Sequence, residues 1–243
     1  MKALVLRLRG PMMSFGMPAI DKHRPTADHP GRAQMTGLLA NALGWERTEF
    51  LRLAQLQAGL RVASRADRGG TPLEDLQTVD FGQPRLNGTG WTTRGEVQTR
   101  SGSAENQVGT YLRYRHYLAD AAYTVLVTVT PEAGTTLDAL EQALRRPERP
   151  LFLGRSVCPP SMPLFDPVMP QVEGRSWVTC FDSLPLFDDH DEVVRFWLPV
   201  DESDPEFAGC SDDSMIRSWD LADWAGQAHR GTTREITFAV DLA

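Results

Sequence analysis

Cysteine is scarce in this chain, and the three that occur, Cys158, Cys180 and Cys210, are odd in number and have no paired spacing. This pattern argues against a disulfide framework and is typical of a reducing compartment, so we expect a cytoplasmic protein. The chain also lacks a Cys-x-x-Cys pair and a His-rich tract, which are the usual signs of structural zinc. The sequence therefore predicts no metal site and no cofactor.

Long apolar runs are absent as well. The apolar stretch near the start of the chain, residues 3–6, is interrupted by Arg7 and Arg9, whereas a secretory signal needs roughly 7–15 consecutive apolar residues. No run approaches the ~18 apolar residues that span a bilayer. We therefore expect neither a targeting segment nor a membrane partner.

The chain has no overall excess of positive charge. Its formal net charge is -7, whereas domains that bind nucleic acids are usually basic. Residues 182–223 hold 13 acidic and two basic residues, a balance of -11, whereas residues 1–181 hold 17 acidic and 21 basic residues, a balance of +4. Because local fields decide what a surface attracts, the first 181 residues still suit a nucleic-acid partner.

Apolar periodicity and turn residues divide the first part of the chain into predicted elements. Their order, βαββαβ, is typical of a ferredoxin-like α+β domain. Glycine-rich residues 68–110 would then form a thumb hairpin inserted between the second and third strands, in which residues 79–85 pair with 95–100 around a tip at 87–90. We expect strands at residues 3–8, 60–64, 123–130 and 151–153, and helices at residues 34–43, 48–57 and 137–146.

The character of the chain changes after several prolines near residue 160. Residues 176–181, 193–200 and 235–240 have strand-like patterns, and an acidic loop is expected at residues 201–213. We therefore predict two domains, a ferredoxin-like domain at residues 1–165 and a small β-rich domain at residues 166–243.

The loop after the first predicted strand is unusually apolar. It carries Met12, Met13 and Phe15 between Gly10 and Gly16, where a solvated turn normally has polar residues. We expect an exposed Phe15 that lies against a flat ligand. Further along, Arg24 and Arg32 flank the start of the helix predicted at residues 34–43. Helix N-termini bind phosphate, although these arginines also fit an ordinary capped helix.

Aromatic and basic residues alternate in the segment from Tyr111 to Leu118. Tyrosines offer stacking surfaces and arginines offer charge, so Arg113, Arg115 and His116 are candidates for holding single-stranded RNA. A strand with buried tyrosines and exposed arginines explains the same pattern equally well.

Two further elements carry candidate contacts. Gly154 would let the backbone approach a ligand closely, and Arg155 would reach a phosphate or a base edge, unless this is a plain turn. In the predicted thumb, Trp91 and Arg94 are candidates for contact with RNA or a neighbouring subunit, the alternative for Trp91 being a fold-back anchor. We expect Cys158 to be a packing residue.

Four motifs in the chain are distinctive: residues 24–26 (Arg-Pro-Thr), 36–39 (Thr-Gly-Leu-Leu), 115–121 and 153–159. They resemble the CasD (Cas-five) family of the RAMP superfamily, whose members bind the 5′ handle of crRNA in the type I-E CRISPR Cascade antiviral complex. The resemblance covers about residues 3–57 and 110–165. It implies a non-catalytic protein in a hetero-oligomeric complex, with an adjacent backbone subunit and a large target-recognition subunit as partners. It also implies that Arg115 wedges beside a kinked nucleotide.

Two other functions remain open from the sequence. Residues 22–24 (Lys-His-Arg) together with Tyr114 and His116 have the side chains that metal-independent cleavage of CRISPR repeat RNA requires. An assembly protein without RNA contacts is the second alternative. Paired catalytic carboxylates, a nucleophile elbow and a P-loop are absent from the sequence.

Overall fold

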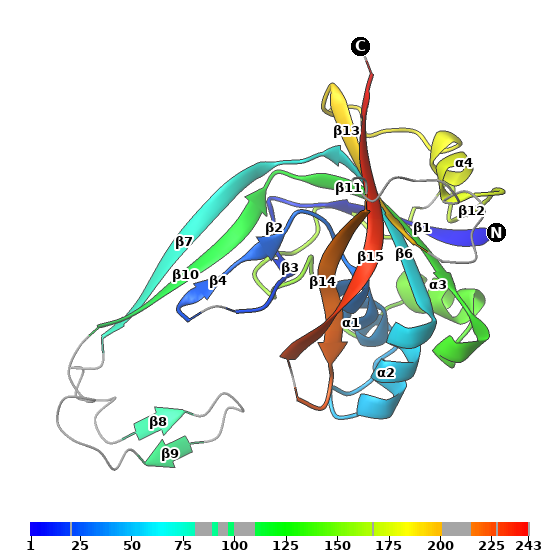
Figure 1. The fold of residues 1–243 in the computed structure, drawn as a ribbon. Coiled ribbons are helices and arrows are strands. Elements are labelled where there is room, and N and C mark those ends of the chain that lie inside the picture. The colour runs from blue at the N-terminus through cyan, green and yellow to red at the C-terminus, as the bar shows by residue number, and fades with distance from the viewer. Residues whose placement is uncertain are drawn as a thin grey trace.

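The strand predicted at residues 3–8 is β1 (Lys2–Arg9), and its residues 3–8 are all buried because both faces of the strand are covered. The structure, a computed structural model, describes residues 1–19, 21–80, 89–91, 97–99, 110–166, 168–200, 215–226 and 228–242. It is a mixed α/β protein built on a central sheet, from which a long arm of two strands extends (Figure 1).

Seven strands form the central sheet, in the order β12-β1-β11-β6-β13-β15-β14. Every neighbouring pair is antiparallel. The strands predicted in the second half of the chain thus continue the same sheet, since β13 pairs directly with β6. The bounds are β6 (Leu60–Arg68), β11 (Ala122–Val129), β12 (Gln171–Glu173), β13 (Val193–Pro199), β14 (Met215–Asp223) and β15 (Ala228–Asp241).

Helices cover both faces of the sheet, so the protein has two apolar cores. The larger core lies under α1 (Arg32–Ala42), α2 (Phe50–Gly59) and α3 (Leu137–Arg145). The smaller core lies under α4 (Trp177–Asp182) and buries Trp177 and Phe181 against β1, β6 and β11. A 3-10 turn at Pro131–Ala133 leads towards α3, which begins at its N-cap Thr136. Within the described residues, no helix is both long and apolar enough to cross a membrane.

The arm consists of β7 (Thr71–Asp80) and β10 (Thr110–Ala119), which pair antiparallel along their whole length. Two short strands from the N-terminal segment, β2 (Met12–Met13) and β4 (His23–Arg24), pair with β10 near the base of the arm. Figure 1 shows β4 alongside β10. The remaining short strands pair as β3 (Phe15–Gly16) with β5 (Thr26–Ala27) and β8 (Thr89–Trp91) with β9 (Val97–Thr99).

The structure corrects three predicted elements. A strand was predicted at residues 176–181, but Trp177–Asp182 form helix α4, because its N-cap Ser176 and Thr179 make a capping box. Residues 151–153 form no strand, since the main chain of Leu153 bonds to Ser14 and Cys158, and β12 lies beside β1 instead. Val79 pairs with Tyr111 and not within residues 95–100. Residues 97–99 pair with 89–91, which include part of the predicted tip, and not with residues 79–85. The rest of the predicted hairpin, at 81–88, 95–96 and 100, lies outside the described residues, as does the acidic loop at 201–213.

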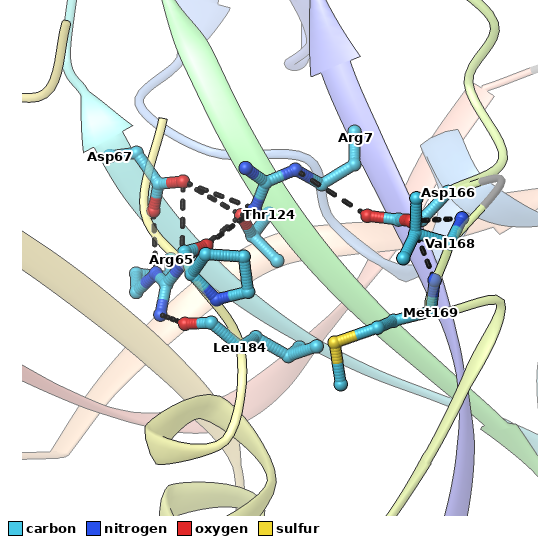
Figure 2. A network of polar contacts seen from close by, with 9 residues as sticks. Arg7, Arg65, Asp67, Thr124, Asp166, Val168, Met169 and Leu184 are labelled. Carbon is cyan, nitrogen blue, oxygen red and sulfur yellow. Dashed lines mark hydrogen bonds and ion pairs between the residues drawn. The ribbon is translucent and has the colours of Figure 1, made fainter. Parts of the chain in front are cut away.

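A buried network of charges joins the first strands of the sheet to the segment after α4 (Figure 2). The Asp67 carboxylate, fully buried, accepts hydrogen bonds from Arg65 Nε at 2.5 Å and Thr124 Oγ1 at 2.7 Å, and lies 3.6 Å from Arg7 Nη1. Arg65 also donates to the carbonyls of residues 181, 184 and 185. The central sheet therefore has a charged centre on the face covered by α4, and its charges are paired.

Candidate nucleic-acid interface

Arg24 and Arg115 lie side by side at the base of the arm. Strand β4 pairs parallel with β10, which sets Arg24 next to Arg115 and His23 next to Tyr114. The rings of His23 and Tyr114 stack at 4.7 Å, so these two side chains share one face of the arm. Because side chains alternate along a strand, Arg24, Arg113 and Arg115 belong to the opposite face. Arg113 and Arg115 are each half-buried.

Arg155 reaches the same place from the loop after α3. Its Nη1 donates to the carbonyl of His116 at 3.1 Å, and its Nη2 donates to the carbonyl of Arg24 at 3.0 Å. Its guanidinium carbon also lies 4.8 Å from the centre of the Tyr117 ring. Arg24, Arg115 and Arg155 therefore meet at one junction, where the guanidinium of Arg155 holds β4 against β10.

Gly154 makes a close approach, but to the protein itself. Its φ is +102°, and a Cβ on it would lie 1.8 Å from the carbonyl oxygen of Ser14. The Ser14 N–H in turn donates to the carbonyl of Leu153 at 3.0 Å. Glycine is therefore required here so that the loop can pack on the N-terminal segment. Cys158 follows in the same loop, fully buried, and burial raises the pKa of its thiol.

The expectation of an exposed Phe15 is wrong. Its side chain is 1% exposed and packs edge-on against Tyr123, with ring centres 5.3 Å apart. The Phe15 N–H donates to Thr26 Oγ1 at 2.8 Å, which fastens β3 to β5. Met13 is also fully buried, so the apolar residues of this loop complete the protein's own core and do not present a surface for a ligand.

Helix α1 begins at Arg32 behind the N-cap Gly31, whose lack of a side chain leaves the first turn without a side-chain cap. Two hollows adjoin this end of the helix. The larger has a volume of about 700 Å³ and the smaller about 380 Å³, and both are lined by Gly16, Ala33 and Gln34. Unpaired N–H groups of a helix start suit a phosphate or another anion.

The walls of the larger hollow include residues that the sequence analysis missed. Three aromatic side chains and two arginines line it, which is the combination that stacks on bases and neutralises phosphates. A signal existed in the sequence, because Trp45 is two residues from Arg47 and Phe152 is three residues from Arg149. The missed residues are Trp45, Arg47, Arg149, Phe152 and Trp224.

On the other face of the arm, imidazole and carboxylate groups converge. His116 Nε2 lies 3.4 Å from a Glu74 carboxylate oxygen, and the rings of His23 and His116 are 6.0 Å apart. Lys22 Nζ lies 5.8 Å from the centre of the Tyr114 ring. The predicted residue His116 is therefore turned away from Arg115. Of the two thumb candidates, Arg94 lies outside the described residues and Trp91 is placed only as part of β8.

Comparisons with known proteins agree with one another. The sequence profile of the family described as "CRISPR-associated protein (Cas_Cas5)" matches residues 3–215. The "CRISPR system Cascade subunit CasD" of Escherichia coli (strain K12) is 34% identical over 167 residues, which are 67% of this chain and 69% of that protein.

Solved structures with a similar fold include a chain of a "CRISPR RNA-guided surveillance complex". That chain has a TM-score of 0.66 and 26% identity, and the match covers 99% of this protein and 90% of that chain. A second, described as "Crystal structure of Cas protein", has a TM-score of 0.62 and 23% identity over 99% of this protein and 94% of that chain, and shows the fold alone. The length of the family match and the CasD identity lead to one conclusion: the chain belongs to the CRISPR-associated protein (Cas_Cas5) family.

Proposed function

We propose that this protein is the Cascade subunit that binds the 5′ handle of crRNA and caps one end of the complex backbone. The observation that carries the proposal is the junction of Arg24, Arg115 and Arg155, three cationic residues from distant parts of the chain. Such a junction at the rim of an exposed strand pair suits an unpaired RNA end, because its phosphates and splayed bases can be contacted by an arginine that the others hold in place.

The fold supports this proposal. In chain order, the four strands of this domain are β1, β6, β11 and β12. The third strand, β11, pairs with both the first (β1) and the second (β6), and the fourth, β12, pairs with the first. That order is the one expected of a ferredoxin-like domain, with the arm as its inserted thumb. We assign this RNA-binding domain to residues 1–165, with β12 (Gln171–Glu173) added to its sheet from beyond that boundary, and the small β-rich domain, whose strand β13 continues the same sheet, to residues 166–243.

The arginines at the junction have different tasks. The guanidinium of Arg155 donates hydrogen bonds to two main-chain carbonyls, and the guanidinium of Arg24 donates to the carbonyls of Asp21 and His23. Arg115 lies beside Arg24 in the register of β4 and β10, and opposite Asp75 on β7. We therefore assign the direct RNA contact first to Arg115, while Arg155 fixes the position of β4.

Helix α1 and the hollows beside it extend this interface. The start of α1 would receive a phosphate next to Arg32, and the larger hollow would receive a base between its aromatic walls. An adjacent backbone subunit and the large target-recognition subunit complete the proposed assembly in the cytoplasm. In this function the protein is non-catalytic, and RNA cleavage belongs to another subunit.

The proposal is tested by salt-dependent binding of a 5′-handle RNA to the purified protein and by crRNA retention in the assembled complex. Arg115→Ala is expected to weaken binding and to reduce the salt slope by about 0.7 per lost phosphate contact. Arg145→Ala is the matched control, because Arg145 is an exposed arginine on α3 paired with Glu141. Unchanged affinity and retention in Arg115→Ala would favour an assembly protein without RNA contacts.

Metal-independent cleavage of repeat RNA is a second candidate function. It is favoured by the grouping of His23, Tyr114 and His116 on one face of the arm, since such side chains can act as base and acid. The test is incubation of repeat RNA with the protein in the presence of a chelator. A cleavage product that appears with the wild type and is absent with His116→Ala would establish this activity. RNA that stays intact with the wild type would exclude it.

A further inference from the structure

Three potential metal ligands meet on the face of the arm opposite Arg115. They are His23 on β4, Glu74 on β7 and His116 on β10, so three strands contribute one side chain each. One ligand atom from each lies within 4.8 Å of the other two. His116 and Glu74 are direct cross-strand neighbours. The backbone pairing itself therefore creates this grouping.

The donor set fits a transition-metal ion. Two imidazoles and one carboxylate are ligands that Zn²⁺ accepts, with bonds of about 2.0–2.2 Å in a tetrahedron whose ligand atoms are roughly 3.3–3.5 Å apart. The separation of 3.4 Å between His116 Nε2 and the Glu74 oxygen already matches one edge of such a tetrahedron. His23 is oriented by its stacking on Tyr114, and its ligand atom, which lies within 4.8 Å of the other two, approaches them when the ion binds.

The site is open to solvent. His23 and Glu74 are exposed and His116 is half-buried, so an ion can enter without any movement of the fold. Three protein ligands leave a fourth position, which water would take. The charge balance is also suitable, because the carboxylate of Glu74 offsets part of the ion's charge and the nearby ammonium of Lys22 is held over the Tyr114 ring.

We propose that His23, Glu74 and His116 bind a single Zn²⁺ ion that fastens β4 to the arm. Strand β4 is two residues long and contacts β10 through few main-chain bonds, among them Tyr114 N–H to the carbonyl of Lys22 at 3.0 Å. An ion shared by β4, β7 and β10 would hold that segment, and with it Arg24, in place. The sequence predicts no metal site here, because the three ligands are far apart in the chain and come together only through strand pairing.

The experiment measures Zn²⁺ binding to the purified full-length protein without RNA, by calorimetry and by metal analysis after dialysis. A Cys210→Ser background is used throughout, so that this thiol cannot act as a ligand. We expect one ion per chain. Both His23→Gln and Glu74→Gln should weaken binding by at least the roughly 10–100-fold that loss of an outer-shell partner of a metal ligand costs. His190→Gln, which changes an exposed histidine at a distant loop, is expected to bind as the parent does.

Co²⁺ provides a second readout, because its visible absorption reports coordination by nitrogen and oxygen ligands in a tetrahedral site. The parent protein should give this spectrum, and His23→Gln should lose it while its circular dichroism stays unchanged. The proposal would be overturned if the parent protein bound no ion, or if His23→Gln and Glu74→Gln bound it as strongly as the parent does. Because no RNA is present, neither result depends on the proposed crRNA function.

Discussion

Arg155 donates a hydrogen bond of 3.0 Å to the main-chain carbonyl of Arg24, although 131 residues separate the two in the sequence. The same guanidinium bonds to the carbonyl of His116 at 3.1 Å. A planar guanidinium can serve two carbonyls at once, which a single ammonium group does poorly. Arg155 is therefore a residue that positions the interface, and its substitution should act differently from the loss of a phosphate contact.

Arg155→Lys should weaken binding of the 5′-handle RNA nearly as much as Arg155→Ala, and neither variant should change the salt slope. The reason is that both lose the two carbonyl bonds that hold β4 to β10, while no phosphate contact is removed. Filter binding over a range of salt concentrations provides the measurement. Full affinity in Arg155→Lys would show that Arg155 acts through its charge alone.

Gly154→Ala should destabilise the protein by about 1–3 kcal/mol or more, because an alanine at φ +102° is strained and its Cβ would collide with Ser14. Gly37→Ala is the matched control, since its Cβ would meet only Trp224 at 3.8 Å. Replacing a glycine inside a helix should stabilise by roughly 0.5–1 kcal/mol. Urea unfolding measures both, and an equal effect of the two substitutions would contradict the packing described for this loop.

Asp67→Asn should cost about 3–5 kcal/mol of folding free energy, because it leaves the buried Arg65 without its counter-charge and leaves Arg7 with only the more distant Asp166 at 4.0 Å. Burial lowers the pKa of Arg7, and the charge of Asp67 acts in the opposite direction. Glu173→Gln, an exposed change at the edge strand β12, should stay within about 0.5 kcal/mol. Thermal and urea unfolding compare the two variants, and a small effect of Asp67→Asn would mean that water reaches the network.

Folding stability should fall in acid through Glu235. Burial raises the pKa of this carboxyl, but hydrogen bonds from His29 and Ser218 and the charge of His29 outweigh it, so the pKa lies below its ordinary value of 4.5. A carboxyl with a lowered pKa in the folded state stabilises the fold above its unfolded pKa, and this stabilisation is lost as the pH falls below 4.5 through the folded pKa.

The free energy of unfolding of Glu235→Gln should therefore depend less on pH in that range than that of the wild type. Urea unfolding of both proteins at several pH values between about 6 and 3 measures the difference. Asp138→Asn, on the first turn of α3 and exposed, serves as a control carboxyl. Parallel stability curves for the wild type and Glu235→Gln would contradict the role given to the contact of 2.9 Å between His29 and Glu235.

Much of the fold follows from local signals. The continuous apolar runs of β1 and β11 and the helical spacing in α1 and α2 were sufficient to predict those elements. Helix α4 (Trp177–Asp182) was missed because its six residues are too few for a clear period, although the capping box of Ser176 was a signal that could have identified it. Register in the arm was not predictable, because it depends on which distant strand each residue faces.

The sequence by itself determined which residues are candidates, because arginine, histidine and glycine carry the chemistry of phosphate contact, metal binding and close approach wherever they occur. Only the tertiary structure decided which of them act together. It joined Arg155 to Arg24, turned His116 away from Arg115 and buried Phe15. The physical reason is that these choices depend on strand pairing and core packing between segments a hundred residues apart, which no local pattern encodes.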